Sequence, residues 1–190
     1  MTNTLVLMAK EPRAGRVKTR LARDIGTVPA AWWQRHMLTT LARCLADPRW
    51  QTVLCVAPDT ARGSPMLPAL PRIPQGGGDL GARMTRAFHT APPGRVLIVG
   101  ADIPAITPQI IAGAFRALAR QKSVIGPTPD GGFWAVGLDT RRPVPRNLFA
   151  NARWSTEHAL ADTLATLPPP AVLPELPDID TAADLARYSS

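Results

Sequence analysis

A cluster of basic residues near the start of the chain has the side chains that bind phosphate. Residues 8–21 read MAKEPRAGRVKTRL and include five cations: Lys10, Arg13, Arg16, Lys18 and Arg20. Concentrated cations in a loop with a flexible glycine, Gly15, suit a di- or triphosphate. The segment is not a P-loop, because that motif needs Gly-Lys-Ser/Thr and here Val17 precedes Lys18. A solvated basic loop or a nucleic-acid patch explains the residues about equally well.

Carboxylates at two other places could hold a divalent cation. Asp102 directly follows the apolar residues 96–101, and Pro104 fixes the turn behind it. Mg²⁺ is commonly bound by one or two carboxylates together with substrate phosphates. Near the end of the chain, Asp178 and Asp180 lie on an extended segment that could add one carboxylate. The alternative is that these aspartates only form turns or cap helices.

Two glycine-containing segments could bring the backbone close to a substrate. Residues 126–134 (GPTPDGGFW) include Asp130, and residues 75–84 (QGGGDLGARM) include Asp79. Turn chemistry alone favours a simple hairpin turn for the first segment. The second also fits an ordinary loop leading into a helix capped by Asp79. The three histidines are scattered, and no Gly-x-Ser-x-Gly motif indicates a serine hydrolase.

Apolar patterns predict the elements that position these residues. Strands are expected at residues 4–8, 52–57, 96–100, 124–125 and 133–138. Helices are expected at residues 29–46, 79–89, 107–120, 155–167 and 181–188, with Thr107 and Ser155 as caps. Residues 61–78 and 168–177 are rich in Pro and Gly, which predicts loops. The alternation indicates an α/β domain with a largely parallel sheet, where ligands bind beyond the carboxyl ends of the strands.

Composition limits the class of protein. A chain of 190 residues that is 45% hydrophobic fits one domain with its own core. No apolar run approaches the roughly 20 residues that span a bilayer, and the start of the chain does not resemble a secretion signal. Cys44 and Cys55 form neither a metal motif nor a disulfide framework, so we expect a cytoplasmic protein with reduced thiols and no membrane partner. The net charge is +8, and most of the basic residues are arginines, which a codon-biased genome also produces. The positions of the charges are therefore more informative about function than their total.

The motifs, taken in order, resemble one family. The segments are AKEPRAGRVKTRL, GDLGARM, GADIP, GPTPDGGFW, WST and DIDT. They are similar to those of small bacterial proteins grouped with nucleotide-diphospho-sugar transferases or GT-A-like glycosyltransferases, and related to the guanylyltransferases for molybdenum cofactor and phospholactate. The resemblance runs from about Leu5 to Leu185. It implies a Rossmann-like GT-A fold, a three-layer α/β/α domain with a mostly parallel central sheet, over residues 1–190.

The resemblance also implies a metal-dependent transferase acting on a nucleotide-activated substrate. One reaction is glycosyl transfer from a nucleotide-sugar, and the other is nucleotidyl transfer from an NTP to a phosphorylated acceptor. The partners are then a nucleotide or nucleotide-sugar and a small-molecule acceptor, with no nucleic acid expected. A catalytically inactive nucleotide sensor and a basic nucleic-acid-binding module are the alternatives.

Residue roles follow from the same resemblance. The nucleotide-binding residues are Lys10, Gly15, Arg16, Lys18, Thr19, Arg20, Gly78, Asp79, Gly81 and Arg83. The acceptor-binding residues are Asp130, Gly131, Gly132, Trp134, Trp154 and Ser155. Asp102 and Asp180 hold Mg²⁺ or Mn²⁺, and the catalytic residues are Lys18, Asp102 and Asp130. The sequence departs from the family at Phe133-Trp134, where tyrosine-like aromatics are expected.

Overall fold

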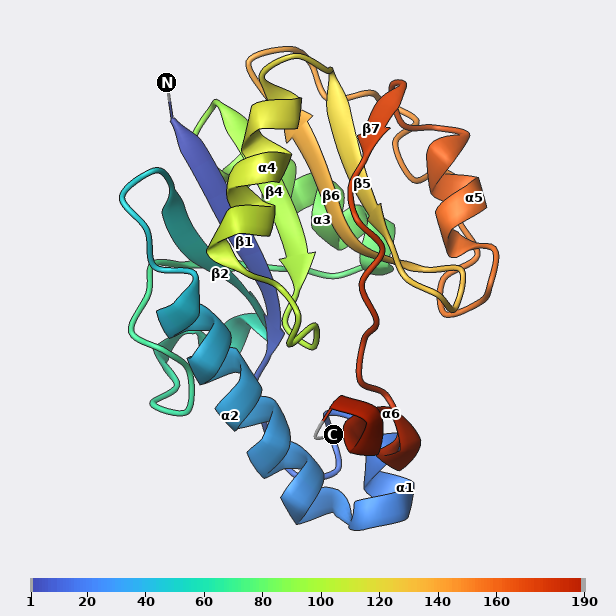
Figure 1. The fold of residues 1–190 in the computed structure, drawn as a ribbon. Helices are drawn as coiled ribbons and strands as arrows, with labels where there is room; N and C mark the ends of the chain where they lie inside the picture. Colours follow the sequence, from blue (N-terminus) through green and yellow to red (C-terminus); the bar gives the residue numbers. More distant parts are fainter. Residues whose placement is uncertain (1, 189–190) are drawn as a thin grey trace.

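A seven-stranded sheet forms the centre of the molecule in a computed structural model that describes residues 2–188 (Figure 1). The strands are β1 (Asn3–Lys10), β2 (Gln51–Ala57), β3 (Arg72–Pro74), β4 (Arg95–Gly100), β5 (Ser123–Pro127), β6 (Phe133–Asp139) and β7 (Pro170–Val172). Their order across the sheet is β3-β2-β1-β4-β6-β5-β7. Every adjacent pair is parallel except the two that involve β6. The mostly parallel α/β architecture predicted from the sequence is confirmed.

Helices cover both faces of this sheet. They are α1 (Leu21–Ile25), α2 (Thr27–Cys44), the short 3-10 helix η1 (Asp59–Gly63), α3 (Leu80–Thr90), α4 (Pro108–Leu118), α5 (Ala159–Leu164) and α6 (Ala182–Tyr188). Because successive strand residues point to opposite faces, Leu5 and Leu7 of β1 pack with α2 and α4, whereas Val6 packs with α3. Within residues 2–188, no helix is both long and apolar enough to cross a membrane.

The central strands are continuous apolar runs because both of their sides are covered. In β4 the residues from Val96 to Val99 are at most 2% exposed, as expected for a parallel strand buried on two faces. The helix starts agree with the sequence as well. The Asp79 side chain accepts a hydrogen bond from Ala82 N, and Thr107 accepts one from Ile110 N.

Four elements differ from the sequence-based expectation. The helix expected from Ser155 is wrong at its start, because Ser155 has φ +61° and α5 begins only at Ala159. Strands β3 and β7 lie inside the two Pro-rich segments expected to be loops. They pair with β2 and β5 through their backbones and lie at the two edges of the sheet, where proline is tolerated. Helix α1 was not expected.

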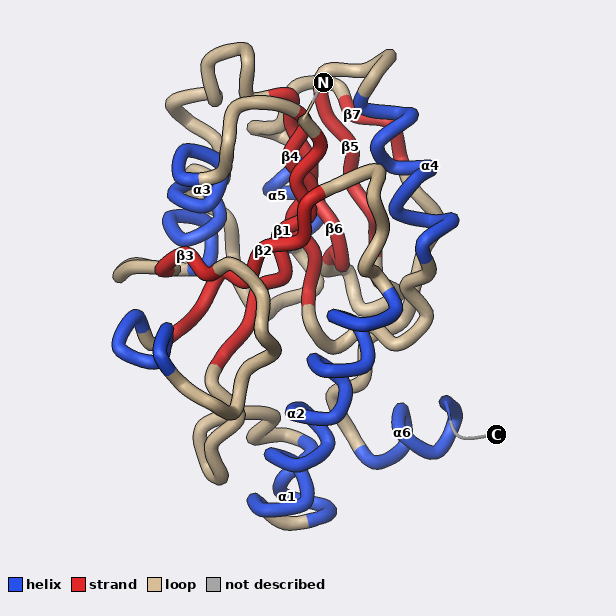
Figure 2. The backbone as a smooth tube through the Cα atoms, turned by 90° about the vertical axis from the view of Figure 1, so that its left-hand side faces the viewer, coloured by secondary structure: helices blue, strands red, loops and turns tan. Residues whose placement is uncertain are grey.

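Segments from both ends of the chain meet beyond the carboxyl ends of β1 and β4. The chain after β7 continues in the direction of that strand past the end of the sheet and forms α6, which lies beside α1 (Figure 1). Figure 2 shows the same arrangement from the side, with α1, the first half of α2 and α6 below the strands. Ala182 N donates a hydrogen bond to Asp24 Oδ2 at 3.1 Å and fixes this contact. The edge of the sheet where α/β proteins bind ligands is therefore built from residues far apart in sequence.

The two cysteines should differ sharply in reactivity. Cys55 lies inside β2 and is fully buried, and burial together with the Asp59 charge raises the pKa of its thiol to about 12. Cys44, at the end of α2, is exposed. Because the thiolate is the reactive form, we expect the native protein to react with one equivalent of a disulfide reagent at pH 8 and the unfolded protein with two. Native Cys44→Ser should then be unreactive, and rapid reaction of that variant would contradict the buried position of Cys55.

Candidate functional site

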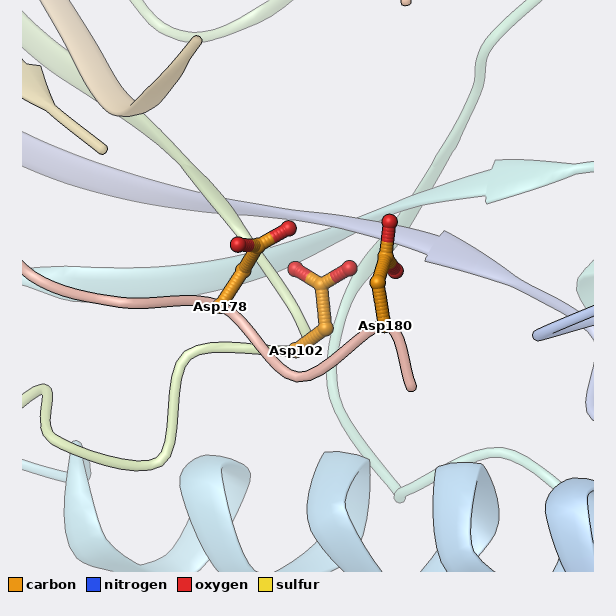
Figure 3. A group of neighbouring side chains, drawn as sticks. All are labelled: Asp102, Asp178 and Asp180. Carbon is orange, nitrogen blue, oxygen red and sulfur yellow. The ribbon is translucent and has the colours of Figure 1, made fainter. Parts of the chain in front are cut away.

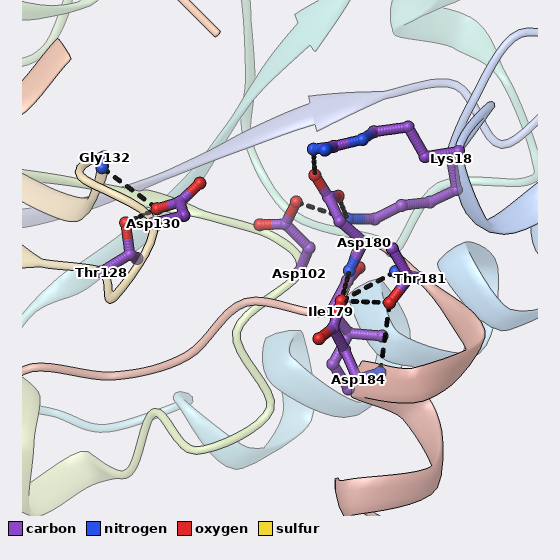
Figure 4. Close-up of polar contacts among 10 residues, drawn as sticks. Lys18, Asp102, Thr128, Asp130, Gly132, Ile179, Asp180, Thr181 and Asp184 are labelled. Atoms are coloured by element: carbon purple, nitrogen blue, oxygen red, sulfur yellow. Dashed lines mark hydrogen bonds and ion pairs between the residues drawn. The ribbon is translucent and has the colours of Figure 1, made fainter. Parts of the chain in front are cut away.

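The Lys18 ammonium lies at the centre of the candidate site (Figure 4). Its Nζ donates hydrogen bonds to Asp102 Oδ2 at 2.7 Å, to Asp180 Oδ1 at 2.8 Å and to the Ile179 carbonyl at 2.7 Å. The side chain is only 7% exposed, and Nζ lies 5.6 Å from the centroid of the Trp33 ring. An ammonium has three N–H donors, so these three acceptors use all of them.

The loop after β1 holds Lys18 in an unusual backbone conformation. Lys18 has φ +46°, in the left-handed region that costs a residue with a side chain roughly 1–2 kcal/mol. The residues around it are anchored, since Val17 is 5% exposed and Leu21 is completely buried. Ala22 N donates to the Lys18 carbonyl at 2.8 Å and begins α1. Packing on both sides of Lys18 thus offsets the strain and aims its side chain at the carboxyl end of the sheet.

Asp102 is placed by the end of β4. Its Oδ1 would lie 2.8 Å from a Cβ on Gly100, so a larger residue there would collide with the carboxylate. The Asp102 carbonyl accepts a hydrogen bond from Ile179 N at 3.2 Å. The GAD motif therefore makes room for a carboxylate at the strand end and docks the C-terminal segment against it.

Three carboxylates meet here: Asp102, Asp178 and Asp180 each offer an oxygen within 4.8 Å of the others (Figure 3). Burial raises the pKa of Asp178 to about 6, reinforced by the charges of Asp180 and Asp102 and opposed by Lys18. Burial alone would raise the pKa of Asp180 too, but Lys18 and Arg20 outweigh it and lower the pKa. Carboxylate oxygens are hard ligands that suit Mg²⁺ and Mn²⁺, so the triad fits such a cation. Asp178 was not assigned to the metal from the sequence, although it belongs to the same DIDT motif.

The end of the C-terminal segment is fixed by its own capping interactions. Asp184 Oδ2 accepts hydrogen bonds from Asp180 N at 3.2 Å, Thr181 N at 2.9 Å and Thr181 Oγ1 at 2.7 Å. Asp184 N donates back to Thr181 Oγ1 at 3.3 Å, which makes a reciprocal cap for α6. Thr181 thus caps the last helix, and the cap also holds Asp180 in place.

The other predicted residues of the basic loop lie toward solvent. Arg20 NH1 reaches Asp180 Oδ2 at 3.1 Å from an exposed side chain. Lys10, Arg16 and Thr19 are exposed, and Gly15 has φ +75° with no neighbour around a hypothetical Cβ. A cavity of about 510 Å³ separates this loop from α2 and is lined by Arg13, Arg16, Val28, Trp32, Arg35 and Met66 among others. The loop is therefore open to an anion.

The segment from Gly78 to Arg83 has a structural explanation for each of its four predicted residues. Asp79 caps α3, and Arg83 Nε donates to the Gly78 carbonyl at 3.0 Å. A Cβ on Gly81 would lie 2.7 Å from Phe149 Cβ and 2.8 Å from Trp154 Cζ2, so only glycine fits. Beside these residues, a cavity of about 590 Å³ also contains Arg86, His89 and Arg146 in its wall.

Among the residues expected to bind the acceptor, the structure corrects the role of Trp134. It is 2% exposed, and its Nε1 donates to the Pro174 carbonyl at 2.9 Å, so the ring belongs to the core and has no face for an acceptor. Asp130 is exposed and closes a turn by accepting from Thr128 Oγ1 at 2.6 Å and Gly132 N at 3.0 Å (Figure 4). This is the hairpin-turn alternative, although the Asp130 charge also acts on Asp178.

The remaining acceptor candidates surround a packed turn. Trp154 lies edge-on to Phe133 and Phe149, with ring centroids 6.2 and 5.8 Å away, and Ser155 is exposed. Gly131 has φ +82°, and a Cβ on it would lie 2.2 Å from the Glu157 carbonyl oxygen.

Gly131 and Gly15 form a matched pair for testing this packing. Both have positive φ, but only Gly131 is crowded by another segment. Gly15→Ala should cost only the left-handed strain of about 1–2 kcal/mol. Gly131→Ala adds a backbone collision, so its melting temperature should fall by at least about twice as much. Equal losses in thermal melts of the two variants would contradict the close approach of Gly131 to Glu157.

Comparisons with known proteins place the chain in a family and identify solved structures with a similar fold. In solved structures, the chain is similar to a protein from Desulfovibrio desulfuricans G20 assigned to the nucleotide-diphospho-sugar transferases, with 27% identity, a TM-score of 0.86, and coverage of 99% of this chain and 87% of that one. Rv0371c from Mycobacterium tuberculosis H37Rv in complex with manganese is 17% identical, with a TM-score of 0.57 and coverage of 98% and 97%.

A third similar structure is 4-diphosphocytidyl-2C-methyl-D-erythritol synthase from Anaerococcus prevotii DSM 20548. It is 12% identical, with a TM-score of 0.60 over 100% of this chain and 99% of that one. These last two likenesses show the fold alone. Curated proteins give no significant match. The model of the family DUF2064, described as "Uncharacterized protein conserved in bacteria", matches residues 40–156. The match spans more than half of the sequence, and the chain belongs to this DUF2064 family.

Proposed function

We propose that the chain is a metal-dependent transferase that acts on a nucleotide-activated substrate. The observation that carries this proposal is the convergence of Lys18, Asp102, Asp178 and Asp180 beyond the carboxyl ends of β1 and β4. An ammonium next to clustered carboxylates is the pairing that a metal-bound diphosphate needs. The Desulfovibrio protein, at 27% identity over nearly the whole chain, supports a nucleotide-diphospho-sugar as the substrate class.

The residues divide into two groups by charge. Asp102 and Asp180, together with Asp178, would hold Mg²⁺ or Mn²⁺, which supplies positive charge next to the oxygens of a diphosphate. The manganese complex of Rv0371c supports a divalent cation in this fold. Arg16 and Arg20 extend toward solvent from the same loop as Lys18 and would bind the phosphates. Most of the rate enhancement would come from positioning and electrostatics.

This arrangement of residues fits two reactions. In nucleotidyl transfer, an acceptor phosphate oxygen attacks the α-phosphorus of an NTP, the bond to the β-phosphate oxygen breaks, and pyrophosphate leaves. In glycosyl transfer, an acceptor hydroxyl attacks the anomeric carbon of a nucleotide-sugar and releases its proton to water, the bond to the diphosphate oxygen breaks, and a nucleoside diphosphate leaves. Both place new negative charge on diphosphate oxygens. The cationic loop from Gly15 to Arg20 stabilises that charge in either case.

The proposal is tested by thermal shift with a panel of nucleotides and nucleotide-sugars, each with and without Mn²⁺. We expect a shift that needs both nucleotide and metal, because bound ligand stabilises only the folded state. A shift with DNA that disappears in high salt, with none from nucleotides, would instead identify a nucleic-acid binder.

Asp102→Asn tests the assignment of the carboxylates. The amide keeps the shape of the side chain but loses the charge, so the metal-dependent shift should disappear and any transferase activity should fall at least about 100-fold. Glu157→Gln is the matched control, since it also removes one negative charge from a side chain that is 80% exposed. A variant Asp102→Asn that keeps full metal-dependent nucleotide binding would refute the proposed site.

A further inference from the structure

The position of the Lys18 ammonium conflicts with the role that a phosphate-binding lysine needs. All three of its N–H donors are taken by Asp102, Asp180 and the Ile179 carbonyl. None remains for a phosphate oxygen while these bonds persist. The ammonium also lies between the carboxylate oxygens of Asp102 and Asp180, which a divalent cation would need as ligands.

We infer that Lys18 is a displaceable internal counter-ion that competes with the divalent cation for Asp102 and Asp180, an inference that rests on the proposed function. Without metal, the ammonium bridges the two carboxylates. When a divalent cation takes their oxygens, like charges repel Lys18 from the triad. Its donors then become free for the phosphates of the substrate. One side chain thus couples metal binding to phosphate binding.

Electrostatics explains why the bridge exists in the first place. Three carboxylates lie together, and among residues 2–188 the cations that pair with them are Lys18 and Arg20. Asp102 belongs to the loop after β4, whereas Asp178 and Asp180 belong to the C-terminal segment, so their repulsion would push these two segments apart. The Lys18 ammonium holds these two segments together. Ile179 adds to this contact, because its carbonyl accepts a hydrogen bond from Lys18 Nζ and its N–H donates one to the Asp102 carbonyl.

The local structure permits exchange. Lys18 has a long unbranched side chain, whereas the carboxylates are short and held by the sheet end and the α6 cap. The neighbouring cation Arg20 is exposed and bonds Asp180 Oδ2, the oxygen that Lys18 does not contact. The mobile partner of the bridge is therefore the lysine, and Asp102 and Asp180 stay in place for an incoming cation.

Direct Mn²⁺ titration by calorimetry separates this role from a merely structural one. In Lys18→Met the competitor is gone, so the protein should bind Mn²⁺ at least about fivefold more tightly than the wild type. The same variant should melt at a lower temperature than the wild type without metal, and Mn²⁺ should restore much of the difference. Lys122→Met, an exposed lysine just before β5, should change neither measurement.

Unchanged or weaker Mn²⁺ binding by Lys18→Met, with binding intact in the wild type, would overturn the inference and leave the proposed function standing. No Mn²⁺ binding by any form, including wild type, would overturn both. If Lys18→Met does not fold, the wild type gives the test by labelling with an amine-reactive ester and mass spectrometry. Labelling of Lys18 should rise when Mn²⁺ is added and fall with chelator, and an Mn²⁺-independent rate would refute displacement.

Discussion

The ion pairs of Lys18 with Asp102 and Asp180 join the parts of the chain on which the candidate site depends. The partners are separated by 84 and 162 residues in sequence. Placing a lysine at 7% exposure has a desolvation cost that one ion pair often fails to offset. Here two carboxylates and a carbonyl saturate the ammonium, and burial, which would lower the pKa of Lys18, is outweighed so that the pKa is raised. The buried lysine therefore stays charged and holds the two acidic segments together.

That contact is possible only because the sheet brings its strand ends together. β1 lies between β2 and β4 and is parallel to both, so the loop carrying Lys18 and the loop carrying Asp102 leave the sheet at the same edge. The C-terminal segment reaches this edge by pairing along β5 as β7 and then continuing past the end of the sheet. The single antiparallel strand, β6, lies on the opposite side of β4 from β1 and leaves this arrangement intact.

The sequence predicts best what is decided locally. The apolar runs of β1 and β4 and the caps Asp79 and Thr107 depend on neighbouring residues, and all of them were predicted correctly. The edge strands β3 and β7 were not, since they form through backbone pairing and have no apolar alternation of their own. Convergence of distant groups has no local signal either. The sequence offered Asp178 and Asp180 as the source of one carboxylate and the resemblance selected Asp180, whereas only the fold shows that both lie beside Asp102.

Trp134 shows how a residue with the wrong predicted role can still serve the site. Its ring fills space that exists because Gly126 has no side chain, where a Cβ would lie 2.4 Å from the indole. Its Nε1 bonds the Pro174 carbonyl, and Leu176 N bonds the Pro127 carbonyl at 3.2 Å. Both bonds hold the C-terminal segment just before Asp178. The GPTPDGGFW motif therefore supports the acidic triad from inside the molecule, and an aromatic residue in its last position is explained by packing and one indole hydrogen bond without contact to an acceptor.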